Sequence, residues 1–327
     1  MAPIHTNVSI PTLCVHSPLD SNAKLNYTYR NKLTNGSFDI WQRSINSDLS
    51  VAAYVADRWL VDLIGNVSRQ QFVGGESELM DNARFYLKTV PAGSTPASIE
   101  QRIEGVRTLA GKQATLTFWA KCGIPDSEMV LTITQCFGTT DDVSVQADVS
   151  ESIGTAELLT VWRKHTFSFE VPSIASKTIG QDGNDYLKIR FALPVDDISL
   201  CNVQLEEGAL ATDFEQRPVD EELRLCKRFY EQINVNQDQY VLNGIGLSGT
   251  QAVFIIPYQT KRSVPVITIP DSDVRLFDIS EVPIWSMGES NDSIGNCFAT
   301  VESGIVQGSI VCAYGYTDSA ITIDAEL

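Results

Sequence analysis

Two tryptophans and a tyrosine occupy strand positions that alternating polarity predicts to face outward, away from the core. In residues 114–121 the small and apolar side chains take every second position, which places Trp119 on the opposite face of a strand. Residues 161–171 and 186–193 alternate in the same way and turn Trp162 and Tyr186 outward. Because a flat aromatic ring facing solvent can stack on the apolar face of a sugar, these three residues predict a glycan-binding surface. A bulge in a strand or a covering segment would instead make the two indoles structural.

Catalytic chemistry has little support in the sequence. Of the three histidines, His5 and His16 lie near the start of the chain, and His165 falls on the apolar face of a strand. No G-x-S-x-G nucleophile elbow occurs. A glycosidase needs two carboxyl groups that face the same substrate. Adjacent residues of a strand point to opposite faces, so doublets of neighbouring carboxylates in this sequence do not suit that role. They fit turns or the start of a helix better. These doublets are Asp141/Asp142, Asp196/Asp197, Glu206/Glu207 and Glu221/Glu222. We therefore expect a protein that is not an enzyme.

Cofactor motifs are also missing from the sequence. Neither a glycine-rich phosphate loop nor a zinc-like spacing of Cys and His is present. Asp182, Asn184 and Asp185 offer oxygen ligands for calcium in a glycine-containing loop, although an ordinary turn explains them as well. We expect no cofactor, with a structural calcium ion as the one alternative.

The composition excludes several partners. The chain has 327 residues, with 24 Lys+Arg against 41 Asp+Glu and a net charge of −17, so polyanionic nucleic acids and anionic membrane surfaces would repel it. No apolar run approaches the roughly 20 residues that span a bilayer, and the start lacks a secretory signal, so we expect no membrane insertion. Seven scattered cysteines without a C-x-x-C pair indicate reduced thiols.

Four segments follow from the pattern along the chain. Residues 1–33 are rich in Pro, Asn and Ser and predict an extended arm for anchoring or assembly. Residues 34–217 alternate in short stretches between turns, which is typical of a β-sandwich or barrel. Residues 218–234 predict an amphipathic helix, with Pro218 and acidic residues at its start and an apolar stripe that includes Tyr230 and Ile233. Residues 235–327 return to strand-like segments and predict a smaller β domain.

A set of short motifs in a fixed order resembles a known module. Residues 33–43 read LTNGSFDIWQR and resemble the N-G-x-F start of jelly-roll carbohydrate-binding modules. The order of the following motifs is similar to a module found in bacteriophage tail-fibre and related virion proteins, and KRSVP at 261–265 resembles the start of the small β domain that often follows it. These motifs are ADRW (56–59), QRIEGVRTLAGK (101–112), LTFWAK (116–121), VQLEEG (203–208), FEQRP (214–218) and LCKRFYE (225–231).

The resemblance carries implications for fold, assembly and ligands. It implies a jelly-roll sandwich, homotrimers on a virion and a role in recognising the host surface. In modules of this type a structural calcium can lie between the N-G-x-F segment and the last strand, which implicates Asp39 and Asn202 here. The neutral Asn202 departs from what a strong calcium site would use.

We therefore expect an all-β virion protein, made in the host cytoplasm, of the tail-fibre or fibre-like adhesin class. Its arm would contact sister subunits or other virion proteins, and the sandwich would bind a bacterial surface carbohydrate. A head fibre or capsid decoration protein with a purely structural role is the first alternative. A polysaccharide-degrading tail enzyme is the second.

Overall fold

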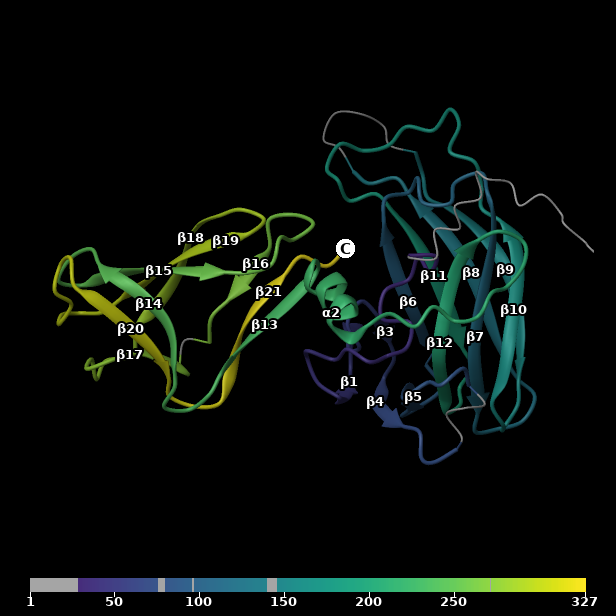
Figure 1. Cartoon of the computed structure of the whole chain (residues 1–327), viewed down its shortest axis with the longest axis horizontal. Helices are drawn as coiled ribbons and strands as arrows, with labels where there is room; N and C mark the ends of the chain where they lie inside the picture. The colour runs from purple at the N-terminus through teal and green to yellow at the C-terminus, as the bar shows by residue number, and fades with distance from the viewer. Residues whose placement is uncertain (1–28, 76–79, 96, 140–145, 271) are drawn as a thin grey trace, which may run out of the picture.

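The computed structural model describes residues 29–75, 80–95, 97–139, 146–270 and 272–327, so residues 1–28 of the predicted arm lie outside the described residues. The described chain forms four β-sheets and a single helix (Figure 1). No helix in this part of the chain is long and apolar enough to cross a membrane. The protein is all-β, as predicted.

The first two sheets form a jelly-roll sandwich. The first sheet has the order β1 (Asn46–Leu49), β4 (Gly65–Gln71), β5 (Phe85–Pro91), β12 (Ile198–Glu207), β7 (Gln113–Cys122), β10 (Arg163–Glu170). The second has the order β2 (Ala53–Tyr54), β3 (Leu60–Asp62), β6 (Ala97–Glu104), β11 (Tyr186–Leu193), β8 (Ser127–Cys136), β9 (Val149–Leu158). Two late strands, β11 and β12, lie in the middle of the sheets between strands formed earlier in the chain, which is the crossover expected of a jelly roll.

Alternating polarity explains how the strands face the core. Leu116 and Phe118 of β7 and Leu187 and Phe191 of β11 are fully buried, in the phases that the sequence predicted. The other face of β7 is not wholly free, because Thr115 is also buried and its hydroxyl donates to the backbone oxygen of Gly208 at 2.7 Å. The chain that follows β12 therefore covers part of the outer face of the first sheet.

The helix is shorter than the sequence predicted. Helix α2 spans Val219–Lys227, and the segment from Tyr230 onward forms β13 (Tyr230–Val235) instead of continuing the helix to residue 234. The prediction was wrong because Tyr230 and Ile233 fit a helical stripe as well as a strand. Antiparallel pairing of β13 with β21 (Ser319–Asp324) gives the backbone N–H and C=O groups of this segment hydrogen-bond partners, and it therefore favours a strand over a helix here.

The last part of the chain builds a second β unit. One sheet has the order β13, β21, β16 (Val266–Thr268). The other has the order β17 (Val274–Leu276), β20 (Ile310–Gly315), β14 (Tyr240–Gly246), β15 (Gln251–Pro257), β19 (Ile294–Thr300), β18 (Ile284–Ser290). The two sheets enclose a core of their own, to which Phe254, Leu276 and Ile321 contribute.

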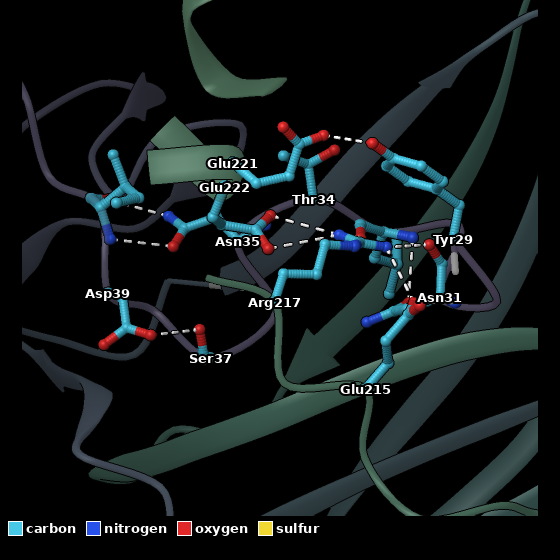
Figure 2. A network of polar contacts seen from close by, with 12 residues as sticks. Tyr29, Asn31, Thr34, Asn35, Ser37, Asp39, Glu215, Arg217, Glu221 and Glu222 are labelled. Atoms are coloured by element: carbon cyan, nitrogen blue, oxygen red, sulfur yellow. Dashed lines mark hydrogen bonds and ion pairs between the residues drawn. The ribbon is translucent and has the colours of Figure 1, made fainter. Parts of the chain in front are cut away.

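A buried network ties the start of the sandwich to helix α2 (Figure 2). The guanidinium of Arg217 lies 3.3 Å from Glu222 and 3.2 Å from Glu215, and it also donates to the backbone oxygens of Asn31 and Leu33. All three charged side chains are less than 10% exposed. Burial raises the pKa of Glu222, and Arg217 opposes that effect. The N-G-x-F and FEQRP motifs therefore meet in one network, because the backbone N–H of Asn35 also donates to Glu222. We call Glu215, Arg217 and Glu222 the joint.

A second joint connects the sandwich to the last residues described. Arg58, with a side chain only 2% exposed, pairs with Glu326, and Arg43 lies 3.5 Å from the same carboxylate. The two guanidinium groups stack on rings at the end of the helix region: Arg58 lies 3.3 Å from the ring of Phe229, and Arg43 lies 3.5 Å from that of Tyr230. These contacts fix β13 and β21 against the sandwich.

Candidate functional site

Trp119 and Trp162 come together on the outer face of the first sheet. Trp119 belongs to β7, and Trp162 directly precedes β10. The ring of Trp162 lies 5.3 Å from Phe72 and 5.3 Å from Tyr86, while Trp119 borders the same cluster. Both indoles are half-buried, whereas Phe72 is buried beneath them. We call Phe72, Tyr86, Trp119 and Trp162 the aromatic patch.

Charged groups hold the aromatic patch in place. The carboxylate of Asp81 accepts a hydrogen bond from the indole nitrogen of Trp119 at 2.9 Å and another from Lys164 at 2.8 Å. Burial raises the pKa of Asp81, but the hydrogen bonds from Lys164 and Trp119 outweigh it and lower the pKa overall. The ammonium of Lys121 lies 5.1 Å from the ring of Trp162, within reach of a cation–π contact. Cations and a carboxylate thus border the exposed parts of the rings.

A cavity of about 570 Å³ adjoins the aromatic patch through Asp81. It is open to solvent at the surface of the sandwich, and its volume is typical of a small-ligand site. Its lining combines one aromatic ring with amide, carboxylate and guanidinium groups from Asp81, Asn82, Arg84, Asp213, Phe214 and Gln216. Rings that cover the apolar face of a sugar, next to groups that bond its hydroxyls, are the elements of a carbohydrate site.

Tyr186 lies apart from the two tryptophans. It begins β11 in the second sheet, where its cross-strand partners are Glu104 and Cys136. The guanidinium of Arg102 lies 5.3 Å from its ring, and burial raises the pKa of its hydroxyl to about 12. A ligand bound at the aromatic patch on the first sheet would not touch Tyr186, so its predicted role stays a prediction.

The residues that the resemblance implicated in calcium binding have other partners. Asp39 accepts a hydrogen bond from Ser37 at 2.7 Å and pairs with Arg84 at 3.0 Å. Asn202 donates to the backbone oxygen of Met80, while its own side-chain oxygen is buried without a partner among the described residues. A guanidinium beside Asp39 does not fit a cation site, since it already neutralises the carboxylate. Within the described residues no three or more His, Cys, Asp or Glu side chains gather as metal ligands would.

His165 and the carboxylate doublets do not assemble a catalytic pair in the part of the chain that the structure describes. His165 is 8% exposed and stacks on Phe118 at 5.2 Å, and burial lowers its pKa to about 4. Asp196 accepts the backbone N–H of Ile124 at 2.7 Å and serves a turn. Glu222 belongs to the joint with Arg217, and the doublet at 141/142 lies outside the described residues.

Sequence reasoning missed half of the aromatic patch and its charged border. Phe72 follows β4 and Tyr86 lies in β5, so each comes from a strand far from Trp119 in sequence. The alternation of Tyr86 and Lys88 around buried Leu87 was a usable signal for an outward ring. Nothing in the spacing of Asp81 indicated that it would bond an indole.

Comparison with known proteins adds a likeness of fold. No protein-family model matches the chain, and no curated protein matches it. Parts of solved structures are similar, among them the CBM22-1-GH10 modules of a Clostridium thermocellum xylanase complexed with xylohexaose, with 12% identity and a TM-score of 0.34. That likeness covers 48% of this chain and 27% of the xylanase chain.

Two smaller solved structures are covered nearly completely by the similar region. The CBM22-2 xylan-binding domain of Xyn10C from Paenibacillus barcinonensis shares 15% identity over 46% of this chain and 92% of its own, with a TM-score of 0.34. TmCBM61 in complex with β-1,4-galactotriose shares 13% identity over 55% of this chain and 99% of its own, with a TM-score of 0.30.

Proposed function

We propose that the protein is a non-enzymatic, carbohydrate-binding component of a bacteriophage particle, which binds a bacterial surface glycan through the aromatic patch. The observation that carries the proposal is that Trp119 of β7 and Trp162, just before β10, border the same apolar cluster beside a polar cavity. The indoles would stack on sugar rings, and Asp81, Lys121 and the cavity lining would bond hydroxyl groups. The ordered motifs of the phage-module resemblance support the placement on a virion.

Assembly is part of the proposal, because single sites of this kind bind weakly. A half-exposed patch offers few desolvated contacts, whereas several linked copies gain avidity without any new contact. The homotrimer that the resemblance implies would supply those copies, and the segment 1–33 would connect them to other virion proteins. The net charge of −17 would keep such a particle protein from binding nucleic acid.

The first test is binding of labelled protein to host cells, with and without periodate oxidation of their surface sugars. We expect periodate-sensitive binding that the double variant Trp119→Ala/Trp162→Ala reduces at least tenfold, the equivalent of about 1.4 kcal/mol. Because the indoles also pack in the patch, Trp119→Phe/Trp162→Phe keeps most of the packing and should show a smaller loss. Circular dichroism establishes that each variant is folded.

The matched control is Tyr186→Ala, which removes an aromatic ring from the opposite sheet of the same sandwich. Full binding by this variant would locate the glycan on the first sheet. Equal losses in all the variants would contradict a site at the aromatic patch. Release of reducing ends from host polysaccharide would contradict the non-enzymatic part of the proposal.

A structural decoration role is the second candidate, favoured by one observation. Trp119 is already held by Asp81, and Trp162 already packs against Phe72 and Tyr86, as structural residues would. In that case the purified protein would bind the virion head and leave host cells unbound at every concentration tested. Particles lacking it would adsorb normally.

A further inference from the structure

Five isoleucines share the outer face of the six-stranded C-terminal sheet. Their side chains are 44–79% exposed, although isoleucine is among the residues most often buried. We call this surface the isoleucine face; its members are Ile245 of β14, Ile255 of β15, Ile284 of β18, Ile294 of β19 and Ile310 of β20. Figure 1 shows β14 and β20 at the end of the molecule away from the sandwich.

Strand register makes the isoleucine face continuous. Ile245 lies directly opposite Ile310 on one neighbouring strand and opposite Val253 on the other. Val253 in turn lies opposite Phe298, so one apolar row crosses four adjacent strands. The alternate positions of the same strands, such as Phe254 and Cys297, are buried in the core beneath. In the outer row Ile245 and Ile310 are exposed, whereas Val253 and Phe298 are half-exposed.

The isoleucine face carries no charge at its centre, although the domain around it is strongly acidic. Residues 235–327 contain 3 Lys+Arg and 11 Asp+Glu, which gives a net charge of −8. The other outward positions of the four central strands β14, β15, β19 and β20 are uncharged: Tyr240, Asn243, Gln251, Val253, Pro257, Asn296, Phe298, Thr300, Cys312 and Tyr314. The edge strand β17 adds one charge to this side of the sheet, Arg275, which lies opposite Tyr314. The outer side of the three-stranded sheet differs, since it presents Gln232, Asn234 and Thr322.

We propose that the isoleucine face binds the equivalent face of sister copies of this chain. Two acidic domains repel each other through most of their surfaces, and the centre of this face is a place where two copies can meet without bringing like charges together. A contiguous exposed apolar surface with a polar rim is also the composition of an oligomer interface. The proposal rests on the assembly stated under the proposed function and assigns a surface to it.

The test compares the mass of the full chain in solution by light scattering for the natural sequence and two variants. Ile245→Glu/Ile310→Glu places two charges at the centre of the face, at positions too exposed for the fold to depend on them. We expect an oligomer that these substitutions convert to monomer. Val266→Glu, at a 70% exposed position on the three-stranded sheet, is the matched control and should leave the oligomer intact.

Salt provides an independent readout of the same interface. Because the domains carry like charges and the interface is apolar, raising the ionic strength should strengthen association. A natural chain that is monomeric at all concentrations and salt conditions would overturn both the assembly and the interface. An oligomer that survives Ile245→Glu/Ile310→Glu, or that salt dissociates, would overturn the isoleucine face alone and leave the glycan site to its own test.

Discussion

At the scale of single residues, the same side chains serve the candidate site and the fold. Asp81 positions the Trp119 indole and Lys164 together, so the orientation of the ring depends on a carboxylate that stays ionised at neutral pH. Trp162 rests on Phe72, and its exposed part is what a ligand would meet. Preorganised rings lose little freedom when a ligand binds, which suits a weak, repeated contact.

His165 makes a prediction about stability against pH. Burial lowers its pKa from 6.5 to about 4, so the unfolded chain binds the proton more readily than the folded one between these values. The stability that neutral His165 contributes is present above pH 6.5 and is lost as the pH falls towards 4. Denaturant unfolding at several pH values should show this loss.

The control for His165 is His165→Phe, which keeps a ring stacked on Phe118 and removes the titration. The free energy of unfolding of this variant should fall less than that of the natural chain between pH 6.5 and 4. Parallel curves for the two proteins would contradict a neutral, buried His165.

At the scale of elements, the short helix α2 depends on the joint at its first turn more than on an apolar stripe. Glu222 is buried there, and Arg217 connects it to Glu215 and to the chain entering the sandwich. Leu223 is only half-buried, so packing alone would hold a nine-residue helix poorly. The ion pairs and hydrogen bonds of the joint therefore stabilise this helix, a role that hydrophobic packing has in longer helices.

Removal of Arg217 should destabilise the protein strongly. Arg217→Met leaves Glu215 and Glu222 buried without their cation, which costs about 3–5 kcal/mol of unfolding free energy. The double variant Arg217→Met/Glu222→Gln removes one of the stranded charges and should recover part of that loss. Chemical unfolding of the three proteins measures this; no recovery in the double variant would show that Glu222 does not depend on Arg217.

Alternation predicted the phase of some strands and missed others in both units. In β7 and β11 every second residue is apolar, so the sequence alone indicated which face of each strand is buried. The strands β18 and β19 were missed because they include Gly288, Gly295 and several small polar residues. The aromatic patch was predicted only in part, since strand order brings Phe72 and Tyr86 to Trp162 and a single sequence does not contain strand order.

At the scale of the whole molecule, two cores are joined by a small set of charged contacts, of which Arg58–Glu326 is buried and Arg228–Glu104 is exposed. The sandwich and the C-terminal β unit each enclose their own apolar cluster. Between them, Arg58 and Arg43 of the sandwich reach Glu326, which follows β21. Arg228 adds a pair with Glu104 at 2.7 Å. The relative placement of the two units thus depends on ion pairs.

Glu326→Gln should loosen the attachment of the two units without unfolding either core. It removes the carboxylate that compensates Arg58, whose side chain is 2% exposed, so two guanidinium groups lose their buried partner. We expect faster proteolytic cleavage near residues 228–230 and two thermal transitions in place of one. Lys112→Ala breaks a solvent-exposed pair with Glu207 and should change neither measurement.

The pairing of β13 with β21 has an evolutionary consequence. Tyr230 lies opposite Asp324, so the chain leaves the sandwich and comes back to it at neighbouring points of one ladder. We call the segment between Asn236 and Asp318 the cassette; its two ends meet at this ladder, and its strand β16 also pairs with β21. Recombination could exchange this cassette for another with equally close ends while the sandwich and its aromatic patch stayed intact. A lineage could thereby vary the outer end of the molecule and the aromatic patch independently.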